Sequence, residues 1–333
     1  MATSPNSKRA QHAWTDFWAD PGSRADHSVR DAGTSQVLRQ HWTYVFDRQF
    51  EAGSSVTLLD AACGDGELLR LAQRCAEPVD GLDLSLHCAD ISPAAVDAAA
   101  RSVVSAEPPR PVVADAASLP FQTASFAVVV SQFGLEYAGA SAFRDAARVT
   151  SGEGSLNALV HRQGGAVELE CRANLALLDL ALERGLLRRL ERLIDLAARV
   201  AAGKGAPAAL SRARASYGAV LDGVGAALRD APPGAARALL QQLWQDCSKV
   251  AVSAEQYSPD QLSAWVASHA ADLESYANRM QSMVDAACDD AGLADICRAL
   301  EAGGLACVDV GELSTPAGGQ ALAWSVAASA NGR

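Results

Sequence analysis

Five short, mainly apolar runs alternate with helical stretches in the first half of the chain, and this alternation constrains the fold more than any other feature. Runs of this length, separated by helices, are typical of parallel strands that are buried on both faces. The pattern predicts an α/β fold with a doubly wound sheet. The runs are residues 56–61, 84–89, 111–114, 126–130 and 156–160, and the clearest helical stretches between them are 93–105 and 141–150.

The alternation stops after residue 165, and residues 166–289 contain no convincing strand. Leu186, Leu190 and Leu193 recur at helical spacing. The sequence Ser258-Pro259 is a strong helix start, with Ser as N-cap and Pro in the first turn, for a long helix reaching about residue 288. The segment therefore predicts an all-helical insertion of four or five helices.

The α/β pattern returns near the end of the chain, where residues 293–301 are typical of a helix and 306–310 and 321–327 of strands. We therefore expect three parts. Residues 1–55 form an N-terminal helical cap, residues 56–165 and 290–333 form one sheet domain, and residues 166–289 are inserted into it. The insertion is interpreted as a substrate lid, with a homodimerisation element as the alternative.

Composition excludes several classes of function. The formal charge of −11 argues against a nucleic-acid binder, because phosphates are neutralised by clustered Lys and Arg. No apolar run approaches the roughly 20 residues that cross a bilayer. The eight cysteines show no CxxC pair, and His, Asp and Glu show no metal-ligand clustering, so no metal site is expected. These features, and the lack of an apolar leader, favour the cytoplasm.

Three aspartates follow or close three successive predicted strands. Asp60 precedes the glycine turn that contains Gly64 and Gly66, and a carboxylate there suits a ligand's amino group better than a pyrophosphate. Asp90 can accept both hydroxyls of a ribose, and Asp115 can accept from an adenine amino group. Open α/β sheets bind ligands at the carboxyl ends of their strands, so these acids predict one ligand site.

With these motifs the sequence resembles the class I S-adenosylmethionine-dependent methyltransferases of small molecules, which have a Rossmann-like sheet. Leu58 to Gly66 is similar to their glycine-rich motif, Asp90 to Val96 to the ribose-binding strand end, and Phe126 to Glu136 to the strand and loop under the reactive methyl. The resemblance implies S-adenosylmethionine as cofactor. The cofactor-binding residues that it implies are Asp60, Ala62, Gly64, Gly66, Asp90, Ile91, Asp115, Ala116, Ser131, Gln132 and Phe133.

The sequence departs from the family pattern at two places. Ala62 stands where the family has its first glycine, and we expect so small a side chain to preserve the turn. Asp90 follows Asp60 by thirty residues, longer than such a unit usually needs, so Asp83 competes for the ribose site. We favour Asp90, because Ser92-Pro93 begins a helix well.

Catalysis is assigned to His161 and Glu136, which end or follow two predicted strands near the cofactor. Either side chain can take a proton from the acceptor, although a structural role is an open alternative for both. Trp18, Tyr137 and Arg162 are the candidate substrate residues, with simple packing as the alternative for Trp18. The predicted reaction is methyl transfer to an O or N atom of a small molecule. A peptide or protein methyltransferase and a non-catalytic cofactor-binding module are the alternatives.

Overall fold

The computed structural model describes residues 14–19, 32–104, 107–253, 258–315 and 319–330. The chain divides into two compact units. We call Met1–Glu170 with Ser282–Arg333 the sheet unit, and Cys171–Gln281 the helical unit. Of the predicted N-terminal cap, residues 1–13 and 20–31 lie outside the described residues.

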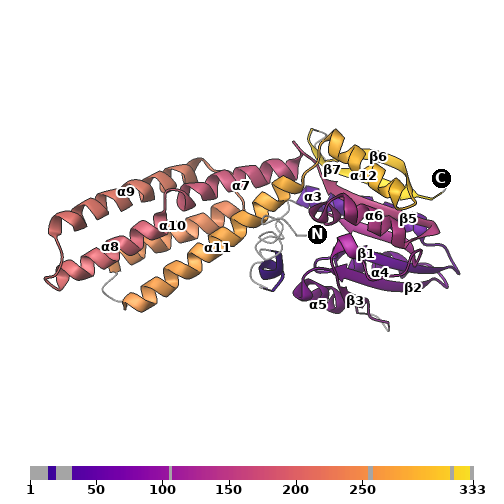
Figure 1. Ribbon diagram of the computed structural model, residues 1–333, viewed down its shortest axis with the longest axis horizontal. Helices are drawn as coiled ribbons and strands as arrows, with labels where there is room; N and C mark the ends of the chain where they lie inside the picture. Colours follow the sequence, from indigo (N-terminus) through magenta and orange to yellow (C-terminus); the bar gives the residue numbers. More distant parts are fainter. Residues whose placement is uncertain (1–13, 20–31, 105–106, 254–257, 316–318, 331–333) are drawn as a thin grey trace. The chain divides into compact units, whose positions relative to one another are not determined.

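The sheet unit contains one mixed sheet of seven strands in the order β3-β2-β1-β4-β5-β7-β6 (Figure 1). The predicted doubly wound α/β class is confirmed for β1 to β5, which pair in parallel. The antiparallel pairing of β7 with β5 and β6 was not expected from the sequence. The strands are β1 (Ser55–Ala61), β2 (Asp83–Asp90), β3 (Arg110–Val113), β4 (Phe126–Gln132), β5 (Thr150–His161), β6 (Ala306–Ser314) and β7 (Ala321–Ser329).

Helices cover both faces of the sheet because neighbouring apolar residues of each strand point to opposite sides. Leu58 belongs to an apolar cluster with residues of α3, α4 and α5, whereas Leu59 belongs to a second cluster with residues of α6 and α12. These helices are α3 (Ala32–Gln49), α4 (Glu67–Ala76), α5 (Pro93–Ser102), α6 (Ala140–Val149) and α12 (Asp290–Ala302), and two short 3₁₀ helices are η1 (Ala116–Ser118) and η2 (Leu135–Ala138).

Five helices follow one another between β5 and α12, and the helical unit belongs to this stretch of the chain. Leu186, Leu190 and Leu193, predicted at helical spacing, are buried. The Tyr217 hydroxyl donates to the Cys247 carbonyl at 2.8 Å, which links α9 to α10. The helices are α7 (Ala166–Leu182), α8 (Leu186–Ala201), α9 (Pro207–Asp230), α10 (Ala235–Ser253) and α11 (Pro259–Ala286). None of the described helices is both long and apolar enough to span a membrane.

The two chain segments that lead into and out of this helical region are joined inside the sheet unit. Arg162, directly after β5, forms a parallel β-bridge with Cys288. The Cys288 N–H donates to the His161 carbonyl at 2.9 Å, and the Gln163 N–H donates to the Cys288 carbonyl at 2.9 Å. Both segments are therefore fixed at the carboxyl end of β5.

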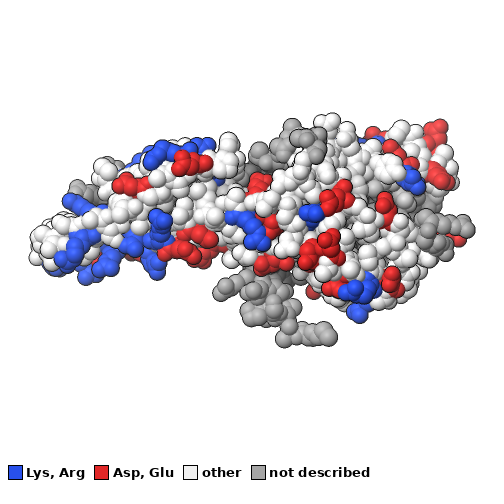
Figure 2. Space-filling model, turned by 90° about the horizontal axis from the view of Figure 1, so that it is seen from above, with Lys and Arg blue, Asp and Glu red and all other residues white. Residues whose placement is uncertain are grey.

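The two units differ in charge. The sheet unit has 28 Asp and Glu residues against 15 Lys and Arg, whereas the helical unit has 11 acidic against 13 basic residues. Figure 2 shows both blue and red side chains on the helical unit and mainly red ones over the sheet unit. The chain's negative charge therefore belongs to the sheet unit.

Candidate functional site

The turn after β1 is held in an unusual backbone conformation. Ala62, Gly64 and Gly66 have φ values of 59°, 52° and 81°, in the left-handed region that costs an L-residue with a Cβ atom roughly 1–2 kcal/mol. The Gly64 N–H donates to Asp90 Oδ2 at 3.0 Å, and the Cys63 N–H donates to the Ala89 carbonyl at 3.1 Å. The turn is therefore fastened to the end of β2, with α4 starting directly after Gly66.

Asp60 and Asp90 place two buried carboxyl groups at the carboxyl ends of adjacent strands. Asp60 is 1% exposed, and its Oδ2 has no hydrogen-bond partner among the described residues. Burial raises the pKa of Asp60 well above its usual value, and Cys88 and Asp90 raise it further. Burial also raises the pKa of Asp90, against the lowering effect of N–H groups that include those of Ser92 and Gly64. Such a pair favours a ligand that brings positive charge or hydrogen-bond donors.

Asp83, the competing candidate for the ribose site, lies at the opposite end of β2. It pairs with Ser55 at the amino end of β1, and the Ser55 hydroxyl donates to Asp83 Oδ2 at 3.2 Å. The structure therefore brings Asp90, and not Asp83, to the glycine turn. The long spacing between Asp60 and Asp90 is taken up by the turn before Asp83 and by eight residues of β2.

The remaining predicted contacts of the nucleoside lie at the next strand ends. Asp115 follows β3, is exposed, and accepts from the Ala117 N–H at 2.9 Å, so its carboxylate caps η1, which begins at Ala116. Ile91 directly follows Asp90 and is 36% exposed. Both positions belong to the same sheet edge as Asp60, but they are open to solvent.

The end of β4 packs closely against the turn after β1. Ser131 is buried, and its hydroxyl has no partner among the described residues. Gln132 accepts from the Trp42 indole at 2.7 Å and donates to Glu67 at 3.2 Å, so it ties α3 to α4. A Cβ atom on Gly134 would lie 2.5 Å from the Ala62 Cβ, so only glycine fits at position 134.

His161 and Glu136 form a buried pair, which the sequence analysis did not predict although it named both residues. Glu136 Oε1 accepts from the His161 backbone N–H at 3.0 Å and lies 2.6 Å from His161 Nδ1. The two side chains are 1% and 3% exposed. Because a carboxylate only accepts, Nδ1 carries the proton and Nε2 presents a lone pair in the neutral ring. Neither Nε2 nor Glu136 Oε2 has a partner among the described residues.

Aromatic rings surround this pair. The Phe133 ring centroid lies 4.5 Å from that of His161, and the Tyr137 centroid lies 5.7 Å away. Phe133 has a φ of 55°, a second strained position beside the site. Trp14, which the sequence analysis did not assign to the site, lies 5.5 Å from Tyr137 and donates to the Ser282 hydroxyl at 3.1 Å. The four-residue spacing of Trp14 and Trp18 was the available signal.

Two of the predicted substrate residues have other neighbours. The Arg162 guanidinium donates to Glu312 at 2.6 Å and lies 4.7 Å from the ring of Trp324, so it is engaged by β6 and β7. Trp18 lies against the glycine turn, since a Cβ atom on Gly64 would be 2.7 Å from its ring. Trp18 is therefore placed beside the predicted cofactor residues.

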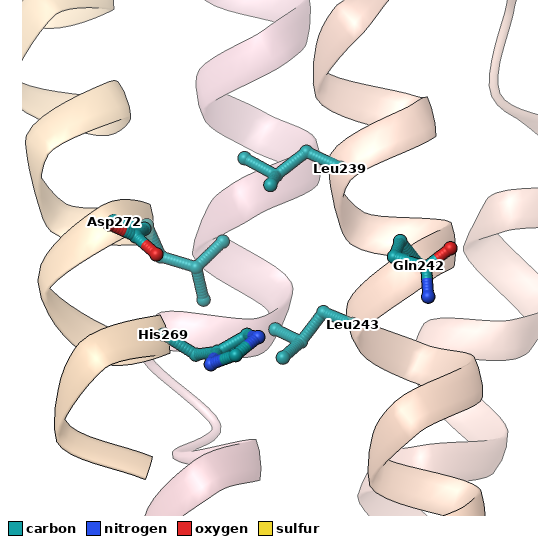
Figure 3. Close-up of a pocket in the computed structure, with 6 residues that line it drawn as sticks. Leu239, Gln242, Leu243, His269 and Asp272 are labelled. Carbon is teal, nitrogen blue, oxygen red and sulfur yellow. The ribbon is translucent and has the colours of Figure 1, made fainter. Parts of the chain in front are cut away.

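The helical unit has a small cavity of its own between α10 and α11, with a volume of about 90 Å³ (Figure 3). None of its lining residues belongs to the predicted site, and three of them are leucines. The lining residues are Leu239, Gln242, Leu243, His269, Asp272 and Leu273. Within the described ranges, His, Cys, Asp and Glu form no group of three or more that could hold a metal ion.

Comparisons with known proteins identify part of the sheet unit. Residues 58–154 match the model of a family described as a methyltransferase domain. No curated protein matches the chain. The matched region runs from β1 into β5 and thus contains the glycine turn, the strand-end aspartates and Glu136.

Similar solved structures include geranyl diphosphate C-methyltransferase from Streptomyces coelicolor A3(2), with 18% identity over 48% of this chain and 66% of that chain and a TM-score of 0.34. The [4+2]-cyclase SpnF has 20% identity, coverages of 49% and 63%, and a TM-score of 0.36. Phosphoethanolamine N-methyltransferase 1 from Haemonchus contortus has 12% identity, coverages of 50% and 34%, and a TM-score of 0.37. The chain spans about three fifths of the length of the first structures that it matches, and likenesses this weak carry no argument about substrate.

Proposed function

We propose that this chain, of which residues 58–154 match a methyltransferase domain, uses S-adenosylmethionine to transfer a methyl group to an O or N atom of a small-molecule acceptor. The cofactor supplies an electrophilic methyl group on a sulfonium. The residues of the chain hold the acceptor in line with that methyl, exclude water and receive a proton.

The residues at the carboxyl ends of β1 to β4 fit this cofactor. The partnerless Oδ2 of Asp60 suits an amino group, which would restore favourable surroundings for a buried carboxylate. Asp90, fixed by the N–H groups of Gly64 and Ser92, keeps acceptor capacity for ribose hydroxyls. Asp115 and Ala116 are assigned to the adenine, with Ile91 beside the ribose. Ala62, Gly64 and Gly66 let the backbone approach closely, and Ser131, Gln132 and Phe133 line the neighbouring strand end.

The observation that carries the proposal is the buried pair of Glu136 and His161. Glu136 fixes the His161 ring with a proton on Nδ1, so that Nε2 is available to accept a proton from the acceptor. Glu136 also stabilises the imidazolium that results. A buried pair whose acceptor atom has no partner among the described residues is suited to the role of a general base.

We assign acceptor selection to the helical region that follows β5. Its connection leaves the sheet at the carboxyl end of β5, where long connections in α/β proteins usually carry ligand specificity. Trp18 and Tyr137 are the further candidates for contact with the acceptor. A homodimer formed through this region is the competing role.

The test measures binding and turnover separately. Calorimetric titration with S-adenosylhomocysteine should show binding, and labelled cofactor should yield labelled product from a panel of amines and hydroxyl compounds. Asp90→Ala should lower the affinity for S-adenosylhomocysteine by at least tenfold, because it removes charged acceptors worth about 1.5–3 kcal/mol each, whereas Asp83→Ala at the far end of β2 should leave it unchanged. Binding without any labelled product would contradict a methyltransferase and favour the non-catalytic module.

A further inference from the structure

We infer that the acceptor is an amine, which arrives as an ammonium and is methylated on nitrogen. The inference rests on the proposed function and narrows it from oxygen or nitrogen to one chemical class. Its basis is the charge and the hydrogen-bonding role of the buried polar atoms at one edge of the sheet that have no partner among the described residues.

Three of those four atoms only accept hydrogen bonds, and the fourth, the Ser131 hydroxyl, can accept or donate. Each is buried in the sheet unit and lies at or just beyond the end of β1, β4 or β5, and none has a partner among the described residues. The atoms are Asp60 Oδ2, Ser131 Oγ, Glu136 Oε2 and His161 Nε2. If Asp60 meets the amino group of the cofactor, Glu136 and His161 remain for the acceptor. A ligand that carries several N–H groups satisfies both, whereas a carboxylate or phosphate would face two carboxyl groups, with the neutral Ser131 hydroxyl as a donor.

Arg162 Nε also lacks a partner among the described residues, and unlike the Ser131 hydroxyl it belongs to a cation. The outer nitrogens of Arg162 donate to Gln163 and Glu312, and its guanidinium covers the ring of Trp324. That cation is therefore committed to β6 and β7. Among the described residues named for the site, no unengaged cationic side chain remains for an anionic acceptor.

Aromatic faces and overall charge point to the same class of acceptor. Phe133 and Tyr137 pack around His161, and Trp14 packs on Tyr137. Aromatic rings attract cations through their quadrupole, and they give a neutral hydroxyl no comparable advantage. The excess of acidic residues in the sheet unit also raises the local concentration of cationic ligands.

Each proton and electron pair that moves in this reaction has a donor and an acceptor among the groups already named. The ammonium gives one proton to His161 Nε2, and Glu136 pairs with the imidazolium. The freed nitrogen lone pair forms the N–C bond while the S–C bond breaks, and that bond's electron pair stays on sulfur. The products are the methylated amine and S-adenosylhomocysteine.

The experiment uses three probes of similar size: 2-phenylethylamine, 2-phenylethanol and 3-phenylpropanoate. Each is titrated into the full chain saturated with S-adenosylhomocysteine. The amine should bind at least tenfold more tightly than the alcohol, and the acid should bind most weakly. Glu136→Gln should lower the ratio of the amine's affinity to the alcohol's affinity by at least tenfold. It should leave the affinity for S-adenosylhomocysteine within twofold of wild type.

Glu153→Gln is the matched control, because it removes the same charge from an exposed position near the amino end of β5. It should preserve the order of the three probes. His161→Gln, which keeps the carboxylate, is a second variant that should also reduce the amine's advantage. Tighter binding of the alcohol or the acid, or an unchanged preference in Glu136→Gln, would overturn the inference. Failure of the wild type to bind S-adenosylhomocysteine would instead contradict the proposed function.

Discussion

At the scale of single residues, the site is built from groups that the fold alone does not favour. Asp60 is a buried carboxyl group with a partnerless oxygen, and Ala62 and Phe133 hold left-handed backbone conformations. Each costs stability, and all three lie at adjacent strand ends. Such local costs are typical of positions kept for binding a ligand.

Asp60→Asn should stabilise the ligand-free protein and weaken cofactor binding. Because the folded-state pKa of Asp60 lies above its unfolded value, the ionised form is penalised in the fold. This penalty is absent below the unfolded pKa and grows as the pH rises towards the folded pKa. At pH 8 we expect the variant to gain about 1 kcal/mol in denaturant unfolding and to lose at least tenfold in affinity for S-adenosylhomocysteine. Asp83→Asn is the control, and equal effects in both variants would contradict the assignment.

Ala62→Gly should raise the free energy of unfolding by about 1 kcal/mol, because glycine adopts this φ without the strain that a Cβ atom causes. Ala124→Gly is a matched control, since Ala124 has the same φ of 59° in an exposed turn. Urea unfolding should show a similar gain for both variants. A gain at position 124 with a loss at 62 would mean that the contact between the Ala62 methyl and Gly134 outweighs the backbone strain.

At the scale of elements, the parallel strands could be predicted because consecutive apolar residues are enough to mark a strand that is buried on both faces. The start of β5 could not, because Ser151 to Gly154 interrupt the apolar pattern before Leu156. The contact between Glu136 and His161 could not be predicted from the sequence either. It depends on the adjacency and register of β4 and β5, which no local pattern encodes. Single candidate residues were therefore found, but not their contact.

A contact between α12 and β6 predicts chemistry outside the site. Cys297 and Cys307 place their sulfur atoms 2.7 Å apart. Burial and the hydrogen bond to Cys297 raise the pKa of Cys307 to about 12, so the Cys307 thiol resists ionisation. Hydrogen peroxide should oxidise Cys297 to a sulfenic acid, and Cys307 should then displace water to form a disulfide.

Intact-mass analysis should show the loss of two hydrogens, with the crosslinked peptide joining residues 297 and 307. Cys307→Ser should instead stop at the sulfenic acid, which a dimedone label would report. Two unlinked, separately oxidised cysteines in the wild type would show that the contact is not reactive.

At the scale of the whole molecule, the chain combines an acidic sheet unit that holds every predicted cofactor residue with a helical unit of nearly balanced charge. The family match ends at residue 154, before the helical unit begins. We therefore propose that the sheet unit binds the cofactor and that the helical unit contributes to the selection of the acceptor.

Replacing residues 171–281 with a short Gly/Ser linker should retain binding of S-adenosylhomocysteine and abolish methyl transfer, if the helical unit selects the acceptor. Calorimetry reports the first property and labelled cofactor the second. A linker variant that still methylates the same acceptor and differs only in its sedimentation would assign the helical unit to oligomerisation instead.

The bridge between Arg162 and Cys288 has a consequence for how such a protein evolves. Through hydrogen bonds among His161, Gln163 and Cys288, the backbone closes on itself at the foot of the insertion, so the two ends of the insertion are held together within the sheet unit. We therefore expect that a helical segment of different length or sequence, joined at the same two ends, would leave the strand register unchanged. Exchange of this segment would then change the acceptor while the residues at the strand ends keep their positions.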